Sequence, residues 1–299
     1  MSEKMKNFIL RTVFGALFVI VMVGGIVWRA DSMILLFAVI TGMTLWEYTG
    51  LVNNHVRHAQ VNRFISTVAG VYLFLAVAAL QLGLVSNFAV FVPYLLTIIY
   101  LLVSELYLKQ ENPIHDWAYT MFGQMYIALP FSLLNVLAFG VDTDGVAVYN
   151  WLLPLSIFIF LWVNDSGAYC VGSLFGRNKL FPRISPGKSW EGSIGGAAFV
   201  IAAAAAIGWL SSDRTLFAGT TVFQPFNSYY FLLVWMGLGL VVVVFGTWGD
   251  LVESLFKRTL GIKDSGNVLP GHGGMLDRFD SSLLAIPAAV VYLYTVSIL

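Results

Sequence analysis

Charged residues are scarce in this sequence. Asp, Glu, Lys and Arg make up only 11% of its 299 residues, whereas soluble domains carry about 25%. So few charges cannot cover the surface of a water-soluble globule of this size, and the surface must therefore face lipid. The single cysteine, Cys170, excludes an internal disulfide. Since 16 Lys and Arg balance 16 Asp and Glu and form no basic arm, nothing indicates nucleic acid as a partner.

Hydrophobic residues make up 59% of the chain and fall into long runs. A spanning helix needs about 20 mostly apolar residues. The first run follows Lys4, Lys6 and Arg11 but has no cleavage site typical of a signal peptide, so we interpret it as a retained helix. We predict an all-α, polytopic membrane protein with about nine transmembrane helices. The predicted spans cover roughly residues 12–28, 32–52, 64–84, 88–108, 117–139, 151–174, 193–210, 229–247 and 283–299.

The loops between these spans predict the orientation, because Lys and Arg favour cytoplasmic loops. With nine spans and a cytoplasmic N-terminus, only Arg29 and Arg214 fall outside, which leaves 14 of the 16 Lys and Arg inside. The C-terminus is then external. Several of these basic residues can serve catalysis rather than orientation, yet the count still places them on one side. By order along the chain, we divide the sequence into residues 1–150, with spans 1 to 5, and 151–299, with spans 6 to 9 and the polar site.

Acidic residues recur at helical spacing near the cytoplasmic ends of the last two predicted spans. The two predicted helix faces comprise Asp250, Glu253, Ser254 and Lys257, and then Asp277, Asp280 and Ser281. Like carboxylates in a low-dielectric setting repel each other unless a cation lies between them. Mg²⁺ prefers carboxylate and phosphate oxygens as ligands. We therefore predict a Mg²⁺ site here and leave open whether a second cation joins it.

A glycine-rich loop, residues 263–274, connects these two faces. Glycines let the backbone approach a ligand closely, and the surrounding Lys and Arg suit phosphates, although anchoring at the membrane surface is the alternative for these bases. For His272, a structural hydrogen bond and a substrate contact remain alternatives. Metal-holding carboxylates beside such a loop indicate metal-assisted phosphoryl or nucleotidyl transfer. The candidate substrate-binding residues are Arg258, Lys263, His272, Gly273, Gly274 and Arg278.

A second polar window begins inside the predicted sixth span. Asp165 lies about 21 Å along that helix, within the hydrocarbon depth, where an acid indicates function unless it pairs with a base in the bundle. After the helix we expect a tight basic turn from Ser185 to Ser189, which resembles an anion-binding turn without the Walker A spacing. Other acids can orient the metal ligands or form ion pairs; these are Glu191, Glu253, Asp264 and Asp280. Glu47 and Glu105 lie near ends of predicted helices, where pairing at the interface is favoured.

The polar positions from Ser254 to Asp280 resemble the signature of the phosphatidate cytidylyltransferase family, S-x-x-K-R-x4-K-D-x4-[IL]-P-G-H-G-G-x-x-D-R-x-D, without departure. Gly249-Asp250-Leu251, Asp165-Ser166 and Ser185-Pro186-Gly187-Lys188 are also similar, and Trp46-Glu47 is a weak match.

The resemblance implies that CTP and phosphatidate give CDP-diacylglycerol and pyrophosphate with a divalent cation, that Asp250 and Asp277 ligate the metal, and that members can be dimeric. It also places such an enzyme in the inner membrane, with its site on the cytoplasmic side. As catalytic residues we take Asp165, Asp250, Lys257 and Asp277, and as further substrate-binding residues Ser185 and Lys188.

Two other functions compete with this one. A transporter or ion channel would use acids to line a path through the membrane, but here the acids gather at one face and spans 2 to 5 are nearly free of ionisable groups away from their ends. A CDP-alcohol phosphotransferase would carry the pattern D-G-x2-A-R-x8-G-x3-D-x3-D, which is absent. Both considerations favour the cytidylyltransferase.

Overall fold

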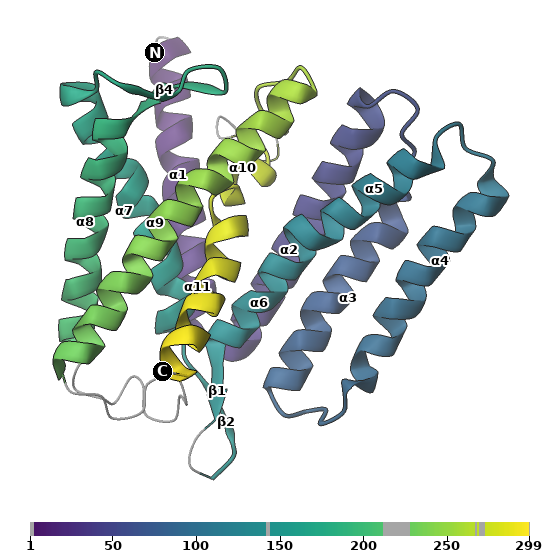
Figure 1. Cartoon of the computed structure of the whole chain (residues 1–299), viewed down its shortest axis with the longest axis horizontal. Coiled ribbons are helices and arrows are strands. Elements are labelled where there is room, and N and C mark those ends of the chain that lie inside the picture. Colours follow the sequence, from purple (N-terminus) through teal and green to yellow (C-terminus); the bar gives the residue numbers. More distant parts are fainter. Residues whose placement is uncertain (1–2, 142–143, 212–227, 267, 269–272, 299) are drawn as a thin grey trace. The chain divides into compact units, whose positions relative to one another are not determined.

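The computed structural model describes residues 3–141, 144–211, 228–266, 268 and 273–298, most of which lie in helices (Figure 1). The helices are α1 (Glu3–Trp28), α2 (Ala30–His55), α3 (Arg63–Gln81), η1 (Phe88–Phe91), α4 (Val92–Leu108), α5 (Pro113–Gly123), η2 (Gln124–Ala128), α6 (Leu129–Ala138), α7 (Leu152–Phe175), α8 (Trp190–Leu210), α9 (Ser228–Thr259), α10 (Leu276–Phe279) and α11 (Ser282–Ile298). The strands are β1 (Phe139–Val141), β2 (Ala147–Tyr149), β3 (Lys179–Phe181) and β4 (Ser185–Ser189). His272 and Arg214 lie outside the described residues.

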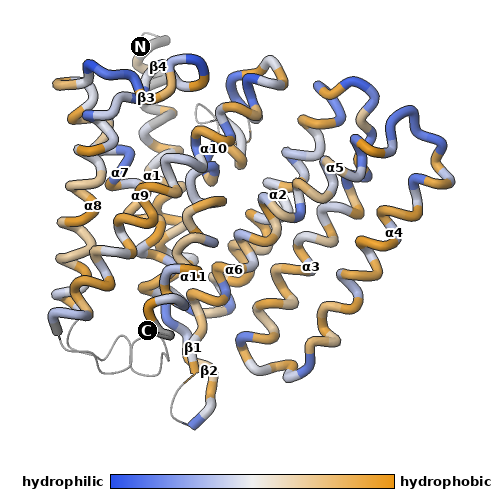
Figure 2. Tube along the Cα trace, in the orientation of Figure 1, coloured by the Kyte–Doolittle hydropathy of each residue, from blue (hydrophilic) through white to orange (hydrophobic). Residues whose placement is uncertain are grey.

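The predicted all-α, polytopic membrane architecture is confirmed. Within the described part of the chain, eight helices are long and apolar enough to cross a membrane. The first predicted span, residues 12–28, is a shorter apolar part of α1. Figure 2 shows the apolar residues along the helices and the hydrophilic ones mainly in the connections. Helices suit this setting because they satisfy every backbone polar group internally where no water is present.

The chain forms two compact units. Unit 1 comprises Met1–Asn135 and Phe256–Phe279, and unit 2 comprises Val136–Leu255 and Asp280–Leu299. The helix α9 contributes its first 28 residues to unit 2 and its last turn, from Phe256, to unit 1. The division at residues 150 and 151 that follows the order of spans stays a prediction.

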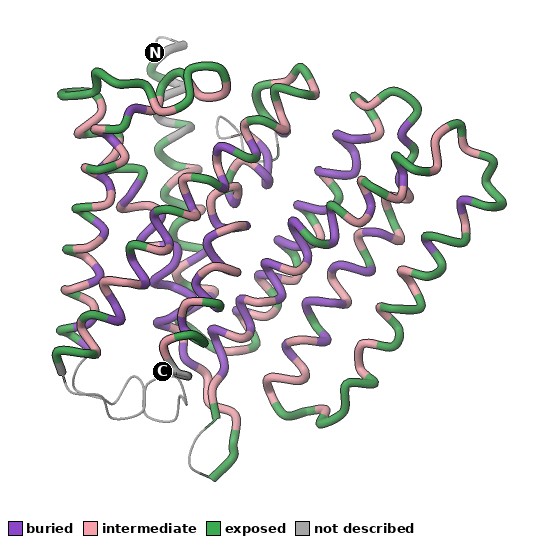
Figure 3. The backbone as a smooth tube through the Cα atoms, viewed as in Figure 1, coloured by how far each residue is buried: buried purple, intermediate pink, exposed green. Residues whose placement is uncertain are grey.

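Unit 1 holds α10 in place through a cluster of aromatic rings. Phe279 of α10 is buried and packs edge-on against Phe131 and Phe18, with ring centroids 5.4 and 5.9 Å away. The outer helix of the unit is α4, since only 11% of the window Phe88–Leu108 is buried against 50% of α2. Figure 3 shows the same contrast along the two tubes. We infer that α4 exposes its apolar side chains to lipid.

In unit 2, α7 and α8 lie against each other through small residues. A methyl group added at Gly192 would lie 2.9 Å from the carbonyl oxygen of Ala168, and one added at Gly196 would lie 2.8 Å from that of Asn164. Two glycines four residues apart let helix backbones approach closely in a membrane. The close packing of α7 and α8 therefore sets the position of the α7 side chains relative to β4, the strand that directly precedes α8.

Two local predictions were wrong. Residues 185–189 form no tight turn but the strand β4, which pairs antiparallel with β3, and the turn lies at residues 182–184. The second acidic helix face is interrupted, because α10 ends at Phe279 and Asp280 lies in a turn before α11 begins at Ser282. The first face is confirmed as helical, since α9 extends without a break to Thr259.

Candidate active site

Asp277, at the start of α10, is the centre of a hydrogen-bonded cluster in unit 1. Its Oδ1 accepts a hydrogen bond from Nζ of Lys257 at 2.6 Å, and both side chains are largely buried, with 8% and 12% exposed. Its Oδ2 accepts the backbone N–H groups of Ser265 and Gly274, each at 2.8 Å. Charge-assisted bonds of this kind are the stronger ones in proteins. The carboxylate is therefore fixed by donors on both of its oxygens.

The glycines of the loop are required by this cluster. Gly273 has φ +82°, a left-handed conformation that L residues rarely adopt, and an added Cβ would lie 2.5 Å from Oδ2 of Asp277. A side chain there would both strain the backbone and displace the carboxylate. Gly273 thus allows the backbone to approach the protein's own carboxylate closely, whereas approach of these glycines to a ligand stays a prediction.

Sequence reasoning missed the part that Glu47 plays in this loop. Pairing at the interface was expected, but the Glu47 carboxylate instead accepts hydrogen bonds from Ser265 and from the backbone of Met275 and Leu276. Ser265 is 218 residues away in the chain, so no local pattern joins the two. The only sequence signal was the weak family match at Trp46-Glu47.

A cavity of about 440 Å³ opens in unit 2 between α7, β4 and α8. Asp165, Tyr169 and Lys188 all line it. The Lys188 ammonium also forms an ion pair with Oδ2 of Asp250, whose Oδ1 accepts a hydrogen bond from Ser254 at 3.1 Å. We call this space the Lys188 cavity. It is lined by Asn164, Asp165, Ala168, Tyr169, Gly172, Ser173, Gly187, Lys188, Ser189, Gly192, Ser193 and Thr247.

The wall of the Lys188 cavity contains a polar atom that sequence reasoning also missed. Asn164 is buried, and its Oδ1 has no hydrogen-bond partner among the described residues. A buried acceptor without a partner costs free energy, so Asn164 is suited to a donor supplied by water or a ligand. The sequence feature that could have identified Asn164 is its position next to Asp165.

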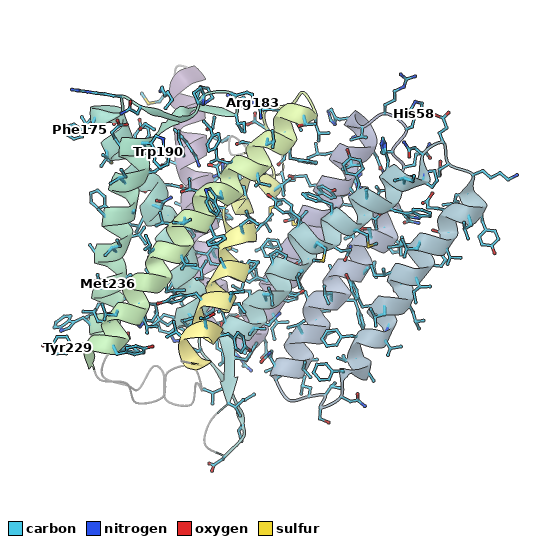
Figure 4. All side chains as sticks on the ribbon, viewed as in Figure 1. His58, Phe175, Arg183, Trp190, Tyr229 and Met236 are labelled. Atoms are coloured by element: carbon cyan, nitrogen blue, oxygen red, sulfur yellow. The ribbon has the colours of Figure 1, made fainter. Side chains whose placement is uncertain are left out.

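The β3–β4 hairpin gathers basic residues at one end of unit 2. Figure 4 shows Phe175, Arg183 and Trp190 around the hairpin and Tyr229 at the opposite end of the helices. Glu191 holds the hairpin, since it accepts the backbone N–H groups of Arg177 and Asn178 at 3.1 Å. The described contacts of Glu191 are thus structural.

The remaining predicted residues make local contacts or are exposed, and one of them is buried. Arg258 donates to the backbone oxygen of Ile262 at 3.2 Å and so closes the end of α9. Lys263, Asp264 and Arg278 are exposed. Ser185 lies at the start of β4. Oδ1 of Asp280 accepts a hydrogen bond from the N–H of Ser281 at 2.5 Å. Glu253 is fully buried.

Comparison with known proteins decides the family. The model of the cytidylyltransferase family matches residues 9–296, which is nearly the whole chain. The chain belongs to the cytidylyltransferase family. The predicted resemblance is thereby confirmed.

Several named relatives are similar over part of their length. A phosphatidate cytidylyltransferase of Haemophilus influenzae is 42% identical over 139 residues, which cover 46% of this chain and 44% of the relative. One of Staphylococcus aureus is 36% identical over 179 residues, or 60% of each chain. One of Staphylococcus haemolyticus is 36% identical over 181 residues, again 60% of each. The chain thus spans about half to three fifths of the length of the relatives it matches.

The carboxylates in these clusters have the donor chemistry that Mg²⁺ requires. Within the described ranges, no group of three or more His, Cys, Asp or Glu could hold a metal ion. Mg²⁺ is usually bound by one or two carboxylates together with substrate phosphates and water. Asp250 and Asp277 each offer oxygen atoms and each has a lysine partner. Each of the two aspartates, taken by itself, therefore fits a metal whose binding depends on the substrate, and not a cage built by protein alone.

Proposed function

We propose that this protein makes CDP-diacylglycerol and pyrophosphate from CTP and phosphatidate. The observation that carries the proposal is the pair of lysine–aspartate clusters, Lys257 with Asp277 and Lys188 with Asp250, in a chain of the cytidylyltransferase family. Paired ammonium and carboxylate groups suit two polyanionic substrates, because the ammonium binds phosphate while the carboxylate can hold a cation. The names of the relatives support the choice of nucleotide and lipid.

In the proposed reaction, an oxygen of the phosphatidate phosphate attacks the α-phosphorus of CTP. The bond from that phosphorus to the oxygen bridging to the β-phosphate breaks in line, and pyrophosphate leaves with the electron pair. A phosphate dianion is already nucleophilic at neutral pH, so no strong general base is required. Lys188 and Lys257 would each neutralise charge on a substrate phosphate.

We assign Asp250 and Asp277 to the metal, and Mg²⁺ when bound would neutralise charge on the transferring phosphate. The structure gives each aspartate a lysine as partner. Each carboxylate would therefore exchange or share that partner when a cation binds. Each lysine would then balance the charge of its aspartate and contact phosphate once it arrives. Whether a second cation joins the site, and whether the protein is dimeric, stay predictions.

We further propose that the β3–β4 hairpin and its end of unit 2 face the cytoplasm, in the inner membrane. The hairpin and the loops around it contain Arg177, Lys179, Arg183 and Lys188, and Lys and Arg favour that side. A water-soluble nucleotide and a lipid phosphate would both reach such a site. Labelling of a cysteine introduced in the hairpin in intact and in opened vesicles would test this orientation.

The function is tested with detergent-purified protein, Mg²⁺, phosphatidate and each nucleoside triphosphate in turn. We expect pyrophosphate release with CTP that depends on phosphatidate. Absence of release from every nucleotide would refute an enzyme and favour the transporter. Release with ATP and not CTP would refute this choice of nucleotide.

A further inference from the structure

In the contacts that the structure describes, Glu47 of α2 is hydrogen-bonded to Ser265 of the glycine-rich loop and to the two residues that directly follow that loop. Its Oε1 accepts from the hydroxyl of Ser265 at 2.5 Å and from the N–H of Leu276 at 3.0 Å. Its Oε2 accepts from the N–H of Met275 at 2.8 Å. The three donors are buried. Both carboxylate oxygens thus bind groups of one short segment.

Two glycines of the loop lie directly against this carboxylate. A methyl group added at Gly266 would lie 2.8 Å from Oε2 of Glu47, and one added at Gly274 would overlap Oε1. Real Cβ atoms essentially never approach that closely. These glycines therefore serve the contact between the loop and Glu47, which gives them a role beside contact with substrate.

The same segment holds Asp277. The Ser265 hydroxyl, which donates to Glu47, accepts from the N–H of Asp277 at 3.3 Å, and the Ser265 N–H donates to Oδ2 of Asp277. The Gly274 N–H donates to the same oxygen. Glu47 fixes Ser265 and the residues after Gly274, so it also fixes the donors that orient the Asp277 carboxylate. Bonds that lock a support group in this way orient a ligand without touching the substrate.

We propose that Glu47 is a positioning residue that holds the Asp277 carboxylate in its working geometry through Ser265. The proposal deepens the cytidylyltransferase function and rests on it. Glutamine is the sharpest replacement for Glu47, because it keeps the shape but turns one of the two acceptors into an N–H₂ group facing a donor. The loop should then loosen around Asp277 while the rest of α2 remains intact.

The first measurement is amide hydrogen exchange on the full chain in detergent. In Glu47→Gln we expect exchange in the peptide covering residues 274–277 to become at least about fivefold faster, because the local opening free energy falls. Glu111→Gln is the matched control, since Glu111 is 73% exposed and pairs with His58 in the same unit. The Asn178 amide, which donates to Glu191, should not change in either variant. Exchange at 274–277 equal to that of the wild type would overturn the proposal.

The second measurement is steady-state pyrophosphate release with CTP and phosphatidate. We expect Glu47→Gln and Ser265→Ala each to lower kcat about tenfold or more, with KM within about twofold, because a misplaced group costs rate rather than binding. The double variant should be no slower than the slower single variant, since the two residues act as a unit. Additive losses, or a kcat equal to that of Glu111→Gln, would contradict positioning through Ser265.

These two measurements separate the proposals. A wild-type protein that releases no pyrophosphate refutes the proposed function, whereas the exchange result still decides whether Glu47 holds the loop. Should Glu47→Gln not fold, Ser265→Ala provides the same exchange test, because it removes only the hydroxyl that joins Glu47 to Asp277.

Discussion

The Asp277 cluster of unit 1 and the Lys188 cavity of unit 2 each contain a lysine–aspartate pair in different surroundings. The pair of Lys257 and Asp277 has 12% and 8% of its side chains exposed, and both oxygens of Asp277 have protein donors. The pair of Lys188 and Asp250 is 27% and 24% exposed and adjoins about 440 Å³ of space. One pair is locked by its loop, whereas the other is open to a ligand.

This difference suggests two roles for the same pair of residue types. A carboxylate held by several donors keeps one geometry and needs little reorganisation when charge develops nearby. A lysine beside an open cavity can move from its aspartate to an incoming phosphate, because an exposed ion pair contributes little free energy. We therefore expect changes in the Asp277 cluster to affect turnover and changes in the Lys188 cavity to affect substrate affinity.

The largest effect is expected for Asp277→Ala. Pyrophosphate release should fall at least about 1,000-fold, because a metal ligand contributes several kcal/mol and each 1.4 kcal/mol is about tenfold in rate. Asp31→Ala, which removes an exposed carboxylate of α2, is the control and should keep its activity. Folding is checked by gel filtration in detergent. Activity above about a tenth of the wild type would remove Asp277 from the metal site.

A smaller effect is expected for glycine-to-alanine substitutions, which test how tightly each of the two regions is packed around an added methyl group. Gly274→Ala would overlap Glu47 and should lower kcat about 100-fold, because small displacements of catalytic groups cost that much. In the Lys188 cavity, Gly187→Ala meets no atom within 4 Å and should change kcat less than about threefold. Gly24→Ala of α1, also in open space, is the control. Equal losses in Gly274→Ala and Gly187→Ala would show that the two regions do not differ in packing.

The transmembrane helices could be predicted from the sequence because lipid requires the same feature of every span, a helix of about 20 mostly apolar residues. Each of the nine apolar runs coincides with described helices over most of its length, and α5, η2 and α6 together form the single span that was predicted. The π-helical turn η2 carries Gln124, whose amide donates to the backbone of Ser66 at 2.8 Å. Such a contact between spans leaves no periodic signal, so the π-helical turn within this span was not predicted.

The polar site could be predicted in its residue types but less well in its contacts. Asp277, Lys257, Asp250 and Lys188 were all chosen from the sequence, yet their pairing was not. The strand β4 escaped prediction because its residues include Pro and Gly, which sequence patterns assign to turns. In the same way, Glu47 was read as an interfacial acid, since its partners lie more than 200 residues away in the chain.

Lys188→Met should affect substrate affinity more than turnover. We expect the KM for CTP or for phosphatidate to rise about tenfold, because a hydrogen bond to a charged group contributes roughly 1.5–3 kcal/mol, while kcat falls less. Lys179→Met, in the exposed strand β3, removes a charge from the same hairpin and serves as the matched control. A change in kcat alone would place Lys188 with the locked cluster instead of the open cavity.

The smallest expected effect is a difference in thermal stability between variants that lack the lysine of one pair or of the other. Lys257→Met leaves the largely buried Asp277 charge without its cation, which costs about 3 kcal/mol in comparable sites. Lys188→Met leaves Asp250 partly exposed to solvent, and the loss of such a pair costs less than about 1 kcal/mol. For a chain of this size the first change lowers Tm by about 6 °C and the second by 2 °C or less. Thermal unfolding in detergent without substrate measures both shifts. Equal shifts would mean that burial does not distinguish the two pairs.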